Sequence, residues 1–149
     1  MTKRVLITGA NRGVGLALVQ TLAADAEHVY AGCRAPRAAT ELQAIAAACG
    51  NVTLLPLDVD DADSLAQAAT SVHTPIDLLV CNAGLLNGYG GLGSNENALD
   101  AESMTAFAAV LQTNIAGPFF TVKAFWQHLQ ASPKAAVAIV SSHMGSQQH

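Results

Sequence analysis

The feature that most constrains this chain is a short apolar run that leads directly into a glycine-rich turn. Val5-Leu6-Ile7 is followed by Thr8-Gly9-Ala10-Asn11-Arg12-Gly13-Val14-Gly15, and a helical pattern begins there. Glycine tolerates positive φ angles and allows a ligand to approach the backbone closely. A helix that starts at such a turn presents free amide groups and about half a unit of positive charge. The segment therefore predicts a strand, a tight turn and a helix start that can bind a pyrophosphate.

The rest of the chain alternates short apolar runs with helical patterns. Strands are predicted at 5–7, 28–32, 52–57, 76–81 and 136–140. Helices are predicted at 13–24, at 38–49, after a cap at Asp60 or Asp61, and from 102 to 130 with a bend at Gly117-Pro118. This alternation is typical of an α/β fold with a parallel sheet. Residues 1–149 leave no room for a separate substrate domain, so a single domain is expected.

Two of the predicted helices show which side should pack against the sheet. Val14, Leu18 and Leu22 are spaced by four in the first helix. Leu42, Ile45 and Cys49 form the predicted inner side of the second. The fifth strand is an apolar run that would form an aggregation-prone edge if nothing pairs with it.

Composition and charge argue against several classes of partner. Hydrophobic residues make up 51% of the chain and charged residues 12%, which suggests elements buried on both faces. The net charge of −4 argues against nucleic acid or an anionic membrane as a partner. No apolar run approaches the ~18 residues of a membrane span, and no export signal is visible. The three cysteines form no metal motif and are expected to be reduced and packed, as in a cytoplasmic protein.

Further signals follow the other predicted strands and support a nucleotide site. Asp58-Val59 ends the third strand, where an aspartate can accept a hydrogen bond from an adenine amino group. Asn82-Ala83-Gly84 ends the fourth strand, where small residues let a cofactor lie against the sheet edge. Asn114 follows about thirty residues later, and Ser142 comes directly after the fifth strand. The glycines alone, spaced G-x-x-x-G-x-G, would be weak evidence.

In their order and spacing these motifs resemble the short-chain dehydrogenase/reductase family. The resemblance implies a Rossmann-type, doubly wound parallel sheet with a cofactor across the carboxyl ends of its strands. It covers the whole chain as the amino-terminal part of such a protein, cut off after the fifth strand. The end of the chain and the run Leu99-Asp100-Ala101-Glu102 look more narrowly like the C-factor branch of the family. The implied cofactor-binding residues are Gly9, Asn11, Arg12, Gly13, Val14, Gly15, Arg34, Asp58, Val59, Asn82, Ala83 and Gly84.

The choice between NADP(H) and NAD(H) is argued from charge at the end of the second strand. NAD-specific members place a carboxylate there to bind the ribose diol. In this chain the position is the uncharged Cys33, followed by Arg34, while Arg12 lies in the glycine turn. Guanidinium groups suit a ribose 2′-phosphate, which favours NADP(H). NAD(H) stays an alternative, with Arg34 as a solvated loop residue.

The resemblance implies a catalytic set of four residues, of which two are found. Asn114 would hold a water of the proton relay, and Ser142 would hydrogen-bond the substrate oxygen. The family's tyrosine, with a lysine four residues later, has no counterpart: Arg34 follows Tyr30 at that spacing and Gly93 follows Tyr89. The chain is therefore expected to be incomplete at its carboxyl end, as a fragment or truncated product.

Three hypotheses on function follow. The first is an NADP(H)-dependent oxidoreductase that interconverts a small carbonyl compound and an alcohol, homo-oligomeric as in relatives. The second is a catalytically inactive nucleotide-binding or C-factor-like signalling protein. The third is a non-functional gene fragment.

Overall fold

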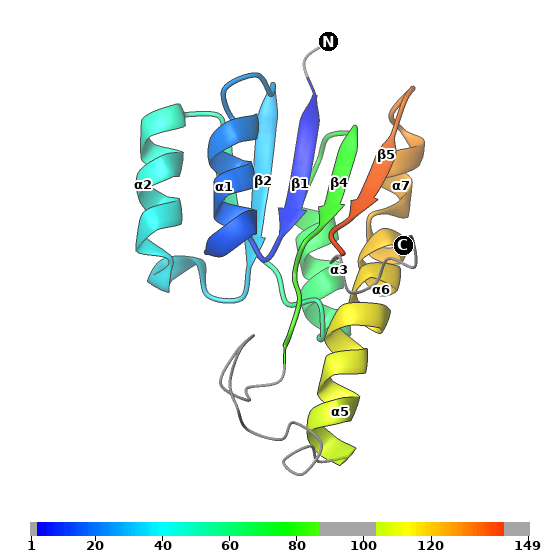
Figure 1. Cartoon of the computed structure of the whole chain (residues 1–149). Helices are drawn as coiled ribbons and strands as arrows, with labels where there is room; N and C mark the ends of the chain where they lie inside the picture. Colours follow the sequence, from blue (N-terminus) through cyan, green and yellow to red (C-terminus); the bar gives the residue numbers. More distant parts are fainter. Residues whose placement is uncertain (1–2, 87–103, 142–149) are drawn as a thin grey trace, which may run out of the picture.

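The computed structural model describes residues 3–86 and 104–141, and shows a parallel five-stranded sheet in the order β3-β2-β1-β4-β5 (Figure 1). The strands are β1 (Arg4–Thr8), β2 (His28–Cys33), β3 (Val52–Pro56), β4 (Leu78–Cys81) and β5 (Ala136–Ile139). The chain builds the sheet outward from β1 to β3, returns, and continues from β4 to β5. The predicted α/β fold with a parallel sheet is confirmed.

Helices cover both faces of this sheet (Figure 1). They are α1 (Gly13–Leu22), a 3₁₀ turn (Pro36–Ala38), α2 (Thr40–Cys49), α3 (Ala62–Ser71), α5 (Met104–Leu111), a π segment (Gln112–Ala116), α6 (Gly117–Ala124) and α7 (Trp126–Gln130). Helices α1 and α2 contribute to the core on one face, and α3, α6 and α7 contribute to the core on the other. The arrangement is a doubly wound, Rossmann-type sheet.

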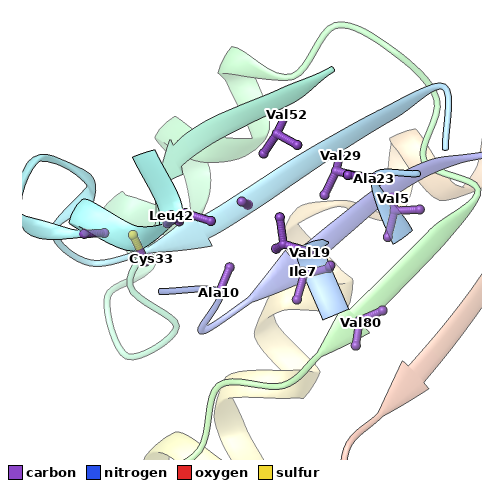
Figure 2. Close-up of a cluster of buried hydrophobic side chains, with 12 residues drawn as sticks. Val5, Ile7, Ala10, Val19, Ala23, Val29, Cys33, Leu42, Val52 and Val80 are labelled. Carbon is purple, nitrogen blue, oxygen red and sulfur yellow. The ribbon is translucent and has the colours of Figure 1, made fainter. Parts of the chain in front are cut away.

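Two separate hydrophobic cores result from the alternation of side chains along each strand. Val5 and Ile7 of β1 point to one face, where they meet Val19 of α1, as Figure 2 shows. Leu6, the residue between them, points to the opposite face and packs with Phe125. The strands are therefore buried on both sides, which explains the high apolar share of the composition.

The predicted inner sides of the first two helices are confirmed at Leu18, Leu22, Leu42 and Ile45, which pack in or against the core, and are wrong at Val14 and Cys49. Val14 is 60% exposed, and the fully buried residue of α1 is Val19. The reason is that the start of α1 lies at the rim of a cleft, where the small Gly15 rather than Val14 faces the protein. In α2, Leu42 is buried as predicted, but Cys49 is exposed because it is the last residue before the solvent-exposed Gly50.

The predicted long helix at 102–130 is wrong in its continuity. Within its described part, the π segment separates α5 from α6, and a turn at Phe125 separates α6 from α7. The Gly117 amide donates to the Gln112 carbonyl, five residues back, and Pro118 has no amide to continue the regular pattern. The expected bend at Gly117-Pro118 therefore takes the form of a π segment that ends there.

Several apolar side chains of α5, α6, α7 and β5 remain exposed. Phe107, Phe119 and Trp126 are each at least half exposed. All four residues of β5 are exposed, and Ile139 reaches 61%. The fifth strand therefore lies at the sheet edge with apolar side chains in contact with solvent, as the sequence predicts.

An ion pair joins the strands at the end of the sheet opposite the glycine turn. The Arg4 side chain donates from Nε and Nη2 to the Asp77 carboxylate, at 3.0 and 3.2 Å. Asp77 also accepts from the Arg4 backbone amide at 2.8 Å and from the Ser132 hydroxyl at 2.7 Å. These bonds, the Arg4 side chain first, lower the pKa of Asp77 from 3.8 to about 2. One carboxylate thus connects β1, the start of β4 and the segment before β5.

We expect Asp77→Asn to destabilise the fold by about 1–2 kcal/mol at neutral pH, because the stabilised ionic form of the carboxylate is lost. Since its pKa is depressed in the folded state, Asp77 stabilises the fold above about pH 4, and this contribution disappears as pH falls towards 2. Urea unfolding between pH 7 and pH 2.5 measures the difference. Asp25→Asn, at an exposed acid, is the matched control; equal pH profiles for Asp77→Asn and wild type would contradict the assignment.

Candidate functional site

A cleft of about 610 Å³ opens at the carboxyl ends of the strands. Its walls come from the segments that follow β1, β2, β3 and β4, and it lies where the strand order changes direction between β1 and β4. Such switch points are where doubly wound sheets bind ligands. The predicted site residues that line the cleft are Gly9, Asn11, Arg12, Gly13, Val14, Arg34, Asp58, Val59, Asn82, Ala83 and Gly84.

The sequence did not predict every residue of the cleft lining. Leu57, Leu85 and Thr113 lie on its walls, as does the short stretch after Arg34 that contributes Ala35, Ala38 and Ala39. Most of them are neighbours of predicted residues along the chain. Thr113 carries no motif of its own, although its position beside Asn114 was a usable signal.

Two glycines explain the shape of the turn between β1 and α1. Gly13 has a φ of +53°, a conformation that L side chains rarely adopt, and open space surrounds it. Gly15 does not line the cleft but lies beneath its floor: a Cβ atom there would lie 2.2 Å from the Gly9 carbonyl oxygen. The absence of a side chain at position 15 is therefore what lets α1 begin directly against the turn.

The start of α1 fits a negatively charged group. No side chain caps this helix at its N-cap residue, Arg12, and the first turn holds no acidic residue. The first amide groups of a helix have no partner within the helix and carry partial positive charge. Gly13 and Val14 are exposed and line the cleft. A diphosphate bridge placed here would receive amide hydrogen bonds and meet no side chain at Gly13.

Asn82 and Thr8 connect the glycine turn to the end of β4. The Asn82 side-chain amide donates to the carbonyl oxygens of Thr8 and Gly9, at 3.0 and 3.1 Å. The buried Thr8 hydroxyl accepts in turn from the backbone amides of Asn82 and Ala83, both at 3.0 Å. The donors of the Asn82 amide are thus used within the protein, so that its role at the cleft is to hold the floor in place.

Arg34, after β2, and Arg12, in the glycine turn, both line the cleft. Cys33, the last residue of β2, is buried, and burial raises the pKa of its thiol, so the thiol is uncharged at neutral pH. Arg34 follows it, and Arg12 lines the same cleft from the glycine turn. Asp58, the acid among the predicted site residues, lines the same cleft from the segment after β3.

Of the two catalytic residues predicted by resemblance, only Asn114 lies within the residues that the structure describes. Asn114 lies in the π segment, and its side chain forms two bonds with Leu85: Oδ1 accepts from the Leu85 amide at 2.7 Å and Nδ2 donates to the Leu85 carbonyl at 2.8 Å. Ser142 lies outside the described residues, as does Tyr89. Tyr30 is remote from the cleft lining, with its hydroxyl bonded to Thr74 at 2.9 Å.

Comparison with known proteins identifies the family. The model of the short chain dehydrogenase family matches residues 3–149. The chain belongs to this family. An uncharacterised oxidoreductase of Schizosaccharomyces pombe is 36% identical over 148 residues, which cover 97% of this chain and 56% of that protein. Human 17-beta-hydroxysteroid dehydrogenase type 1 is 36% identical over 146 residues, covering 93% of this chain and 42% of the human protein.

A solved structure supports the same assignment. The NADPH-bound carbonyl reductase from chicken fatty liver is 35% identical, with a TM-score of 0.80, and the match covers 91% of this chain and 57% of that one. The chain spans about half the length of the curated relatives it matches. Its fold and family are therefore those of oxidoreductases.

Two further observations concern residues 3–86 and 104–141. None of their helices is long and apolar enough to cross a membrane. No group of three or more His, Cys, Asp or Glu side chains is arranged there to hold a metal ion.

Of the free cysteines, Cys33 and Cys81 are buried and Cys49 is exposed, so the expectation that all three are packed is wrong for Cys49.

We expect Gly15→Ala to destabilise the fold by about 3 kcal/mol, because the added methyl group would overlap the Gly9 carbonyl oxygen. Gly13→Ala is the comparison: it meets no neighbouring atom, and its positive φ should cost only about 1 kcal/mol. Urea unfolding of both variants measures the difference. Equal losses at the two positions would show that the close approach at Gly15 is not what requires glycine.

Proposed function

We propose that this chain binds a nicotinamide dinucleotide, NADP(H) in preference to NAD(H), as the cofactor-binding part of an oxidoreductase that interconverts a carbonyl compound and an alcohol. The cofactor preference is supported by the residues that line the cleft at the end of β2. There the cleft is lined by the uncharged Cys33 and by Arg34, with Arg12 also on its wall. A 2′-phosphate can be bound by guanidinium groups in bidentate geometry.

The cofactor would lie across the carboxyl ends of the strands. Its diphosphate would meet the amides at the start of α1, and Asp58 would accept from the adenine amino group, as the family resemblance implies. The NADPH bound to the chicken relative supports this choice of cofactor. When bound, the cofactor supplies the hydride for carbonyl reduction or accepts it from the alcohol.

The substrate would lie beyond the nicotinamide, near Asn114. In the proposal Asn114 holds a water of the proton relay and Ser142 donates to the substrate oxygen. The two bonds from Asn114 to Leu85 fix its side chain and use one of its two N–H donors and one lone pair of its oxygen. The substrate class is a small carbonyl or alcohol compound, and the setting we propose is the cytoplasm.

One observation favours a second candidate, a nucleotide-binding protein without catalysis. The 149 residues hold no tyrosine followed four positions later by lysine, and the Tyr30 hydroxyl is bonded to Thr74 away from the cleft lining. By resemblance, the tyrosine of that missing motif is the proton donor in the family. The 149-residue chain would then retain cofactor binding and lack the proton donor.

We expect Arg34→Ala to weaken NADPH binding about tenfold or more and to leave NADH binding nearly unchanged, because the lost hydrogen bonds are to the 2′-phosphate that only NADPH carries. Isothermal titration calorimetry with both cofactors at low and high salt measures the effect. Arg37→Ala is the matched control, since Arg37 is an exposed arginine three residues away that does not line the cleft. Equal losses for the two cofactors would contradict the NADP(H) preference.

We expect the 149-residue chain to bind NADPH yet to oxidise it with aldehydes or ketones at no more than background rate. Loss of a positioned general acid removes about 10²- to 10⁴-fold in rate. Absorbance of NADPH at saturating cofactor, beside a binding titration on the same sample, separates the two properties. Turnover comparable with that of the relatives would overturn the second candidate, and absence of any NADPH binding would overturn both.

A further inference from the structure

We propose that Thr113 and Asp60 are positioning residues for the cofactor: their hydrogen bond orients Asp58, which faces the cleft. This inference rests on the proposed function, because it assumes that the cleft binds a dinucleotide. Neither residue belongs to a motif that the sequence singled out for cofactor binding.

The bond itself spans two elements that are far apart in sequence. The Thr113 hydroxyl, in the π segment, donates to the Asp60 carboxylate at 2.7 Å. Thr113 is only 7% exposed, although it lines the cleft, whereas Asp60 lies on the surface after β3. A buried hydroxyl needs a partner, and the short distance to a carboxylate makes this a strong one.

The bond continues from Asp60 to the cleft wall. The Asp60 backbone amide donates to the Asp58 carboxylate at 3.1 Å, so the orientation of Asp58 depends on where Asp60 is held. Further bonds fix the same turn: the Asp58 amide donates to the Ser64 hydroxyl at 2.9 Å, and the Asp61 carboxylate caps α3 by accepting from the amides of Asp63 and Ser64. Thr113 is the point at which this turn is connected to the α5–α6 helical segment.

Packing beside the bond shows that the helix lies directly on the turn. A Cβ atom at Gly117 would lie 3.1 Å from Val59 Cγ2, so Gly117 leaves just enough space for the Val59 side chain. Val59 itself lines the cleft. The hydrogen bond at Thr113 and the contact at Gly117, one turn later, therefore hold the wall formed by Asp58 and Val59 from behind.

Through the π segment, one helical segment is hydrogen-bonded to two walls of the cleft, the one after β3 and the one after β4. Thr113 bonds to the segment after β3, and the next residue, Asn114, bonds to Leu85 in the segment after β4. Consecutive residues of a helix point in different directions, which allows each to reach a different wall. The separation of the two walls at this end of the cleft is then set by the π segment.

The test compares Thr113→Val, which keeps the shape and removes the hydroxyl, with Thr113→Ser, which keeps the hydroxyl. We expect Thr113→Val to weaken binding of NADPH, and of adenosine 2′,5′-bisphosphate, about fivefold, and Thr113→Ser to bind both as wild type does. Thr121→Val is the matched control: it removes an equally buried hydroxyl that bonds within its own helix, to the Gly117 carbonyl, outside the cleft lining. We expect Thr121→Val to bind both ligands as wild type does.

A double-mutant cycle with Asp58→Ala separates positioning from a general structural role. If Thr113 acts through the Asp58 carboxylate, Thr113→Val has no further effect on NADPH affinity once that carboxylate is removed. An undiminished fivefold loss in the Asp58→Ala background would overturn the inference, as would normal binding by Thr113→Val. If the wild-type chain does not bind NADPH, both the proposed function and this inference are overturned. If the wild-type chain binds NADPH and Thr113→Val binds it equally well, this inference alone is overturned.

Discussion

The placement of the cleft floor depends on one side chain, the carboxamide of Asn82. It donates to the carbonyl oxygens of Thr8 and Gly9, just where β1 becomes the glycine turn. Thr8 is buried and Gly9 is partly buried, and a buried backbone carbonyl without a donor costs about 1–3 kcal/mol. The start of α1 in turn packs on the same atoms, since a Cβ at Gly15 would meet both the Gly9 oxygen and the Asn82 amide. The turn, the helix start and the end of β4 are therefore fixed together.

The opposite end of the sheet is stabilised in a different way and holds no part of the cleft. There Asp77 accepts bonds from Arg4 and Ser132, and connects three segments through a charged group. Between these ends, the strands are joined by two apolar cores on opposite faces. The carboxyl ends of the strands instead hold the uncapped start of α1 and the two arginines that line the cleft.

The sequence was sufficient for the fold and for most of the cleft lining, because both depend on local patterns. Alternating strands and helices predicted the parallel sheet, and residues at strand ends necessarily meet at one edge. The spacing of four in α1 correctly placed Leu18 and Leu22 against the core, but it missed the buried Val19 and failed at Val14, because the close contact at Gly15 decides how the start of the helix is rotated. The π segment was missed because it depends on the placement of Thr113 and Asn114 against two loops, which no local propensity encodes.

Cys33 connects the core to the proposed cofactor preference. It is 3% exposed, belongs to the apolar cluster beneath α1 and α2, and also lines the cleft. A carboxylate in this place would lose most of its hydration, and burying an unpaired charge is costly. An uncharged residue at the end of β2 therefore suits the packing of the core and, at the same time, puts no negative charge at position 33, next to Arg34. In this chain the affinity for a phosphorylated ribose would follow from the same side chain that completes the core.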